Sequence, residues 1–138
     1  MTFVIDTNVV AYFLLGTMPF ASEAERFMAV AKHGLAPVVW EAELANVVWM
    51  AIRAGTLSAE DGAARLRAAS HIGIDSVPIG ALCQGALVRS VTSGIAVYDT
   101  LFVELAVRVG APLATFDRGI LRAFPGVAAR PGALAGLQ

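Results

Sequence analysis

The chain has one cysteine, one lysine and few charged residues of either sign. A single cysteine, Cys83, excludes an internal disulfide and a cysteine-based zinc cluster. Its apolar neighbours in the segment GALCQGAL predict that Cys83 packs as a small residue of the core. Charged residues make up 15% of the chain, against roughly 25% in an average soluble domain. This composition is typical either of a membrane protein or of a protein that covers part of its surface with a partner.

The sequence also lacks a long uninterrupted apolar stretch. The longest uncharged stretch near the start, residues 7–22, is broken by Gly16 and Pro19 and is too short for a spanning helix, which needs about 20 apolar residues. No basic segment precedes it, so we do not expect a signal peptide. We therefore expect a soluble, cytoplasmic oligomer with no membrane segment, folded as a single domain over residues 1–138.

The net charge of −1 makes the whole chain unlike a general basic nucleic-acid binder. Nine of its ten basic residues are arginines, which bind phosphates better than lysine does, but they form no evident basic strip in the sequence.

Hydrophobic periodicity and turn residues predict strands that alternate with helices. Strands are expected over 2–5, 35–39, 74–79, 113–116 and 126–130. Helices are expected over 8–15, 22–32, 41–54, 58–70, 80–93, 97–109 and 117–124. Alternation of this kind predicts an α/β fold, a three-layer α/β/α sandwich with a central, mostly parallel sheet.

Four acidic residues lie at the edges of apolar runs: Asp6, Glu43, Asp99 and Asp117. Asp6 and Asp117 directly follow predicted strands, and ligands of open α/β sheets bind beyond the carboxyl ends of the strands. Glu43 and Asp99 lie near the starts of predicted helices. Carboxylates held together repel one another unless a cation compensates, and Mg²⁺ or Mn²⁺ prefers oxygen ligands. The pattern therefore indicates a divalent-metal site.

Each acid also has a purely structural interpretation. Asp6 and Asp117 are favoured residues for capping the helices that follow them. Asp99 would complement the dipole at the start of its helix, and Glu43 would be a solvated helix residue. Only the occurrence of all four at one end of a predicted sheet favours a site.

The residues around these acids resemble a known family. Asp6-Thr7-Asn8 after an apolar start, Glu43 three residues before Asn46, Tyr98-Asp99, and Thr115-Phe116-Asp117-Arg118 look like a PIN-domain ribonuclease, and most like the VapC-like toxins of toxin–antitoxin pairs. The resemblance covers nearly the whole chain. It implies Mg²⁺- or Mn²⁺-dependent endonucleolytic cleavage of RNA, a transfer RNA or a ribosomal RNA loop. It also implies a VapB-like antitoxin partner and a homodimer.

Carried over by position, the four acids match the acidic quartet of that family. Asp6 and Asp99 are then the best metal ligands, while Glu43 and Asp117 bind the metal directly or through water. Polar residues beside the quartet would orient carboxylates or water, or contact substrate. These are Thr7, Asn8, Asn46, Thr115 and Arg118. For Asn46 and Arg118, an ordinary exposed position is an equally good interpretation or a better one.

Glu41 is the rival of Glu43, because both lie in the segment WEAELAN. On a helix Glu41 aligns with apolar residues, whereas Glu43 aligns with Asn46 and a more mixed face, so Glu43 is preferred. Glu104 is expected to point away from the site, and Tyr98 to pack beneath Asp99.

The favoured hypothesis is a metal-dependent endoribonuclease. The non-enzymatic alternative is a catalytically silent PIN-like module that binds RNA or serves assembly. A phosphatase with Asp6 as nucleophile would need a second carboxylate where the chain has Asn8.

Overall fold

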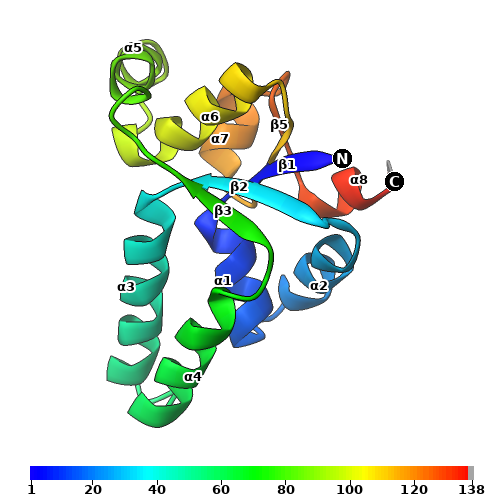
Figure 1. The fold of residues 1–138 in the computed structure, drawn as a ribbon, viewed down its shortest axis with the longest axis vertical. Helices are drawn as coiled ribbons and strands as arrows, with labels where there is room; N and C mark the ends of the chain where they lie inside the picture. Colours follow the sequence, from blue (N-terminus) through cyan, green and yellow to red (C-terminus); the bar gives the residue numbers. More distant parts are fainter. Residues whose placement is uncertain (137–138) are drawn as a thin grey trace.

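The computed structural model describes residues 1–136 and contains a five-stranded sheet between two layers of helices (Figure 1). The strands are β1 (Thr2–Ile5), β2 (His33–Pro37), β3 (Ile74–Val77), β4 (Leu113–Ala114) and β5 (Ala128–Ala129). The helices are α1 (Thr7–Leu15), α2 (Ala21–Val30), α3 (Val39–Arg53), α4 (Ala59–Ala69), α5 (Cys83–Ser93), α6 (Val97–Val109), α7 (Arg118–Ala123) and α8 (Pro131–Ala135). All strand pairings are parallel, and the predicted α/β fold is confirmed.

The order of the strands in the sheet is β3-β2-β1-β4-β5. From β1 the chain moves outward to β2 and then β3, and right-handed crossovers place α1 to α4 on one face. It then returns past β1 to β4 and β5, which places α5 to α7 on the other face (Figure 1). The direction reverses between β1 and β4, and the carboxyl ends of these two neighbours form a switch point where ligands of such sheets bind.

The core lies around β1 and α6. Phe3, Val4 and Ile5 are at most 1% exposed, and every residue of α6 from 100 to 106 is buried. The middle of this helix is buried because it packs between the sheet and α5. Among residues 1–136 no single helix is long and apolar enough to cross a membrane, although α5 and α6, bent by 115° at their junction, reach that length as a pair.

The element boundaries differ from the predictions mainly where one apolar run serves two elements. Residues 35–40 read LAPVVW, and β2 ends at Pro37 so that α3 begins at Val39, where the prediction extends the strand to 39. In α3 the buried residues Trp40, Leu44 and Val48 recur at helical spacing. Helix α8 was not predicted, because its five residues, PGALA, are too few to carry a periodic pattern.

The prediction that Cys83 packs in the core is wrong. The thiol is free and exposed on the first turn of α5. Ala86 is the only buried residue of this helix, so an apolar sequence around Cys83 does not place it inside.

Candidate active site

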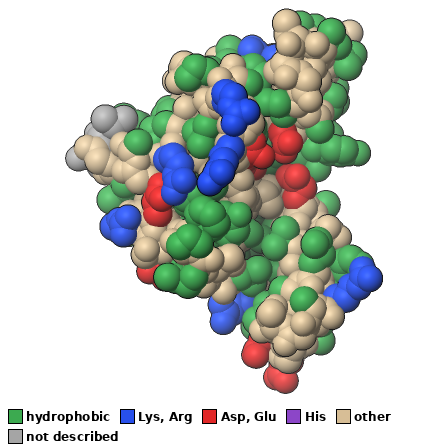
Figure 2. All heavy atoms as spheres, turned by 180° about the vertical axis from the view of Figure 1, so that it is seen from behind, with side chains coloured by type: hydrophobic (Ala, Val, Ile, Leu, Met, Phe, Trp, Pro, Cys, Tyr) green, Lys and Arg blue, Asp and Glu red, His purple; other side chains and the backbone are tan. Residues whose placement is uncertain are grey.

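Four carboxylates meet at the switch point of the sheet. They line one pocket of about 360 Å³, called here the acidic pocket. Its lining residues are Asp6, Thr7, Asn8, Ala11, Tyr12, Glu43, Val47, Asp99 and Asp117. Figure 2 shows Asp and Glu side chains gathered along a hollow on the back face of the molecule. The structure thus brings together all four acids that the sequence singled out: Asp6 follows β1, Glu43 lies on α3, Asp99 lies on α6, and Asp117 follows β4 and precedes α7.

Asp6 is the most buried of these acids, at 6% exposure. It follows β1 directly, and its backbone N–H donates to the carbonyl of Ala114 in the neighbouring strand. The hydroxyl of Thr115 donates to its Oδ2 at 2.6 Å, and Nδ2 of Asn8 donates to the same oxygen at 3.3 Å. Its side chain makes no capping bond to α1, so capping does not explain why an acid stands here.

Burial and mutual repulsion disfavour the ionised form of three carboxyl groups in the acidic pocket. Burial raises the pKa of Asp6 to about 7, with repulsion from Asp99 and Glu43 adding to it and the Thr115 hydrogen bond opposing it. Burial also raises the pKa of Glu43, again with a contribution from Asp99. The pKa of Asp99 is raised by burial and by repulsion from Asp117. No basic residue lines the pocket to offset this repulsion.

Two hydroxyl groups hold carboxylates in place. Thr7, on the first turn of α1, donates to Oε1 of Glu43 at 2.8 Å and so ties α1 to α3. Thr115 donates to Asp6 and accepts the backbone N–H of Asp117 at 3.0 Å. Because a carboxylate bound by a fixed donor keeps its orientation, these hydroxyls preorganise the pocket.

Asp117 has two roles in the structure. Its Oδ1 accepts the backbone N–H of Ile120 at 2.8 Å, which caps α7. Its side chain also lines the acidic pocket. The structural interpretation of Asp117 is therefore correct, and it does not compete with a place in the site.

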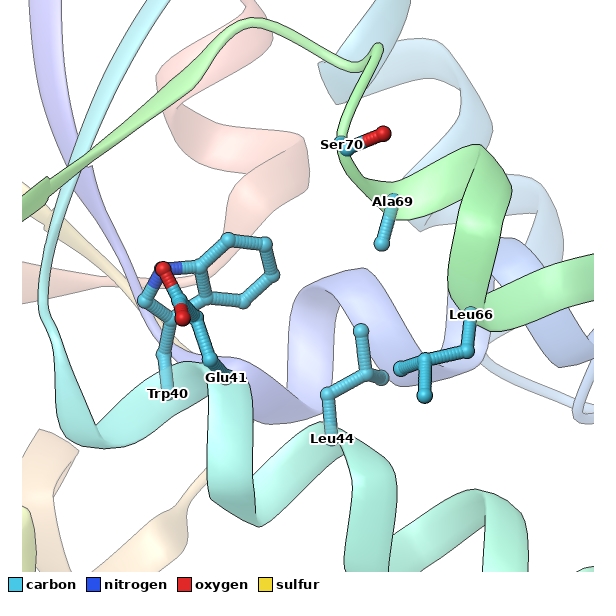
Figure 3. Close-up of a pocket in the computed structure, with 6 residues that line it drawn as sticks. All are labelled: Trp40, Glu41, Leu44, Leu66, Ala69 and Ser70. Atoms are coloured by element: carbon cyan, nitrogen blue, oxygen red, sulfur yellow. The ribbon is translucent and has the colours of Figure 1, made fainter. Parts of the chain in front are cut away.

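Glu41 and Glu43 point into different pockets. Glu41 lies in a separate, mainly apolar pocket of about 340 Å³ between α3 and α4 (Figure 3). There its Oε1 accepts a hydrogen bond of 2.6 Å from the hydroxyl of Ser76, which also accepts from the Trp40 indole. The helical spacing that separated the two glutamates in the sequence therefore gave the right geometry.

Other candidates lie outside the acidic pocket. Asn46 is exposed and donates to the sulfur of Met50, and Arg118 is exposed beyond Asp117. Tyr98 does not pack beneath Asp99, because its side chain is 66% exposed; that prediction is wrong. Glu104 points elsewhere, as expected, and pairs with arginines of α5 and α6. Tyr12, which the sequence analysis missed, lines the pocket one helical turn after Asn8.

The donor set of the acidic pocket fits a hard divalent cation. The pocket offers oxygen ligands without sulfur or imidazole, and its carboxylates lack a compensating charge. As placed, no three His, Cys, Asp or Glu side chains among residues 1–136 lie close enough together to hold one metal ion. This spacing still suits Mg²⁺, which keeps several waters and is held through one or two carboxylates.

Comparison with known proteins relates the chain to one family and one fold. Residues 3–125 match the PIN domain family. A comparison with curated protein sequences yields no match. A toxin–antitoxin complex from Klebsiella pneumoniae is similar with a TM-score of 0.66 and 16% identity, over 93% of this chain and 96% of that chain. The structure of VapBC2 from Rickettsia felis bound to a DNA fragment from their promoter is similar with a TM-score of 0.65 and 16% identity. The match covers 94% of this chain and 98% of that chain. These two structures share the fold of the chain.

Proposed function

Because the chain belongs to the PIN domain family, we propose that it is an endoribonuclease that uses Mg²⁺ or Mn²⁺ and acts as the toxin of a toxin–antitoxin pair. The observation that carries this proposal is the acidic pocket, where four carboxylates converge and no basic side chain among the lining residues offsets their charge. Such an arrangement lowers the stability of the folded chain. It is expected at a functional site, where a bound cation offsets the repulsion between the carboxylates.

Asp6 and Asp99 are the proposed main ligands of the cation, and Glu43 and Asp117 would hold it directly or through water. When bound, the cation supplies a Lewis acid that activates water and offsets the charge that builds up on the phosphodiester. Thr115 and Thr7 keep two of the carboxylates oriented by hydrogen bonds of 2.6 and 2.8 Å. Asn8 links the two sides of the site, since it donates to Asp6 and its Oδ1 accepts the backbone N–H of Phe116.

The proposed substrate is a structured RNA with an exposed single-stranded loop, such as a transfer RNA or a ribosomal RNA loop. The acidic pocket is open to solvent at half-buried Glu43, Asp99 and Asp117. Unstacked nucleotides have the backbone freedom to enter such a pocket, whereas a duplex holds its strands in place.

The test compares RNA cleavage by the wild-type chain with cleavage by Asp6→Asn and Asp99→Asn. Brief expression followed by sequencing of the new RNA ends detects cleavage and locates it. Both variants should lose at least about 100-fold in rate, because each removes a proposed metal ligand rather than a supporting group. Asp61→Asn, an exposed substitution on α4, is the matched control. Full activity in both pocket variants would refute the mechanism.

The proposed partners are an antitoxin and a second copy of the chain, in the cytoplasm. The solved structures of similar fold are toxin–antitoxin complexes, which supports an antitoxin partner. For the homodimer the support is an exposed apolar face of α5, on which Leu87, Val88 and Val91 are 55%, 67% and 79% exposed. Such a contiguous patch is typical of a surface that a partner covers.

The second candidate function is a catalytically silent RNA-binding module. The observation in its favour is the spacing of the acids, which does not bring three of them around one ion. Calorimetric titration with Mn²⁺ and a cleavage assay separate the two candidate functions. A silent module would neither bind the ion nor cut RNA.

A further inference from the structure

Two arginines, Arg118 and Arg122, are unpaired cations on α7, the helix that follows Asp117 of the acidic pocket. Neither has a hydrogen-bond or ion-pair partner within residues 1–136, whereas three other arginines are paired with glutamates. Both side chains are exposed. A cation that stabilises nothing within its own fold is available to an anionic ligand.

Helix α7 starts at the edge of the pocket, and its spacing places both arginines on one face of the helix. Helix α7 begins immediately after Asp117, which caps the helix and also lines the pocket. Ile120 is fully buried and fixes the inner side of the helix. Arg118 and Arg122 are four residues apart, so they lie on the same outer face about 6 Å apart along the axis. Figure 2 shows Lys or Arg side chains beside the gathered acidic ones on this face of the molecule.

A strand of RNA that enters a pocket of four carboxylates meets repulsion at the phosphates nearest to them, since salt screens charges beyond about 10 Å. A bound cation would compensate at the phosphate that is cut, but not at the phosphates that follow it. Those need cations of their own, and arginine binds phosphate well through its planar fork of donors. On the side of Asp117, Arg118 and Arg122 are the first unpaired basic residues that the chain offers.

We propose that Arg118 and Arg122 bind neighbouring backbone phosphates on one side of the cleaved bond and so set the direction in which the RNA strand leaves the pocket. This inference rests on the proposed function, because it assumes an RNA substrate in the acidic pocket. Arg122, which lies one turn farther from Asp117, contributes to binding and not to the chemical step.

The test measures how the affinity for RNA depends on salt. The probe is a fluorescein-labelled single-stranded RNA of about 12 nucleotides, within the range that single-strand sites cover. Fluorescence anisotropy is recorded at several salt concentrations in the Asp99→Asn background, so that the probe stays intact. Each phosphate contact on a single strand contributes about 0.7 to the slope of log K against log salt. Arg118→Gln with Arg122→Gln should therefore lower the slope by about 1.4 and weaken binding about 20-fold at 0.1 M salt.

The matched control is the double variant Arg26→Gln and Arg67→Gln, which removes the same charge from two exposed arginines. They lie on α2 and α4, and neither helix contributes to the acidic pocket. An unchanged slope in the α7 variant, or an equal drop in the control, overturns the proposal. In cleavage assays Arg122→Gln alone should raise KM about fivefold and leave kcat unchanged, the pattern of lost uniform binding. If the wild-type chain binds RNA and the α7 variant lowers the slope as expected, but the wild type does not cut RNA, the nuclease proposal fails and the proposed phosphate contacts are supported. If it does not bind RNA at all, both are refuted.

Discussion

Asp6→Asn should make the cation-free protein more stable at pH 8, although it removes a residue from the centre of the site. Burial raises the pKa of this carboxyl from 3.8 to about 7 in the folded chain. The neutral form therefore favours folding: its contribution is complete below pH 4 and is lost as the pH rises through about 7. Above that value the ionised carboxylate costs roughly 4 kcal/mol relative to a group that stays neutral.

The asparagine keeps an oxygen for the Thr115 hydroxyl and carries no charge, so it removes most of this cost. Burial of its amide takes back part of the gain, and we expect a net increase of about 2 to 4 kcal/mol in unfolding free energy at pH 8. At roughly 3 °C per kcal/mol for a chain of this size, the Tm should rise by about 6 to 12 °C. At pH 4.5 the two proteins should agree within about 1 kcal/mol.

The measurement is thermal and urea unfolding in EDTA at pH 8 and pH 4.5, with Asp61→Asn as the control that removes an exposed carboxyl from the chain. Addition of Mg²⁺ at pH 8 should stabilise the wild type and narrow the difference, because a ligand that binds only the folded state adds to its stability. A variant less stable than the wild type at pH 8, or a difference that does not change with pH, would show that Asp6 is not electrostatically strained.

Three further predictions concern α5 and α6, which lie on the opposite face of the sheet from α1 to α4. Glu104→Gln should cost about 2 to 3 kcal/mol at pH 7 in urea unfolding, because hydrogen bonds from two arginines hold the pKa of Glu104 below its usual value in spite of its burial. This cost should shrink as the pH falls below about 4.5 and disappear once the pH lies below the lowered pKa of Glu104 in the folded chain. Gly85→Ala should cost about 1 to 3 kcal/mol, since its Cβ would lie 2.3 Å from the Glu104 carboxylate, while Gly80→Ala, which meets no atom within 4 Å, should stay within about 0.5 kcal/mol. The thiol of Cys83 should react with a thiol reagent in the native dilute protein and become protected as concentration rises; equal reactivity at all concentrations would contradict a dimer through α5.

The order of the elements could be predicted because most of their ends carry a local signal. Helix α6 begins and ends where predicted, since Gly110 adopts a left-handed conformation after its last residue. Helix α4 begins after Ser58, whose hydroxyl accepts the N–H of Asp61 as a cap. The exact limits of β2 and β5 could not be predicted, because strand pairing across the sheet sets them and the local residues do not.

The candidate site could be predicted to the extent that its residues follow strand ends and helical spacing. Asp6 and Asp117 meet because β1 and β4 are neighbours, a fact of topology that parallel strand order makes plausible but that no local pattern contains. Cys83 and Tyr98 were misplaced for one reason. Apolar neighbours in sequence do not tell which side of a helix faces the core, and both residues lie on the outer side.

The hydrogen bond between Thr115 and Asp6 joins residues 109 positions apart, and this separation has a consequence in time. During synthesis at about 5 to 20 residues per second, the beginning of the site leaves the ribosome roughly 5 to 20 seconds before its end. Until β4 pairs with β1, Asp6 has neither its hydroxyl donor nor Asp117 beside it. The acidic pocket is therefore incomplete until the segment around Thr115 and Asp117 has left the ribosome and β4 has paired with β1.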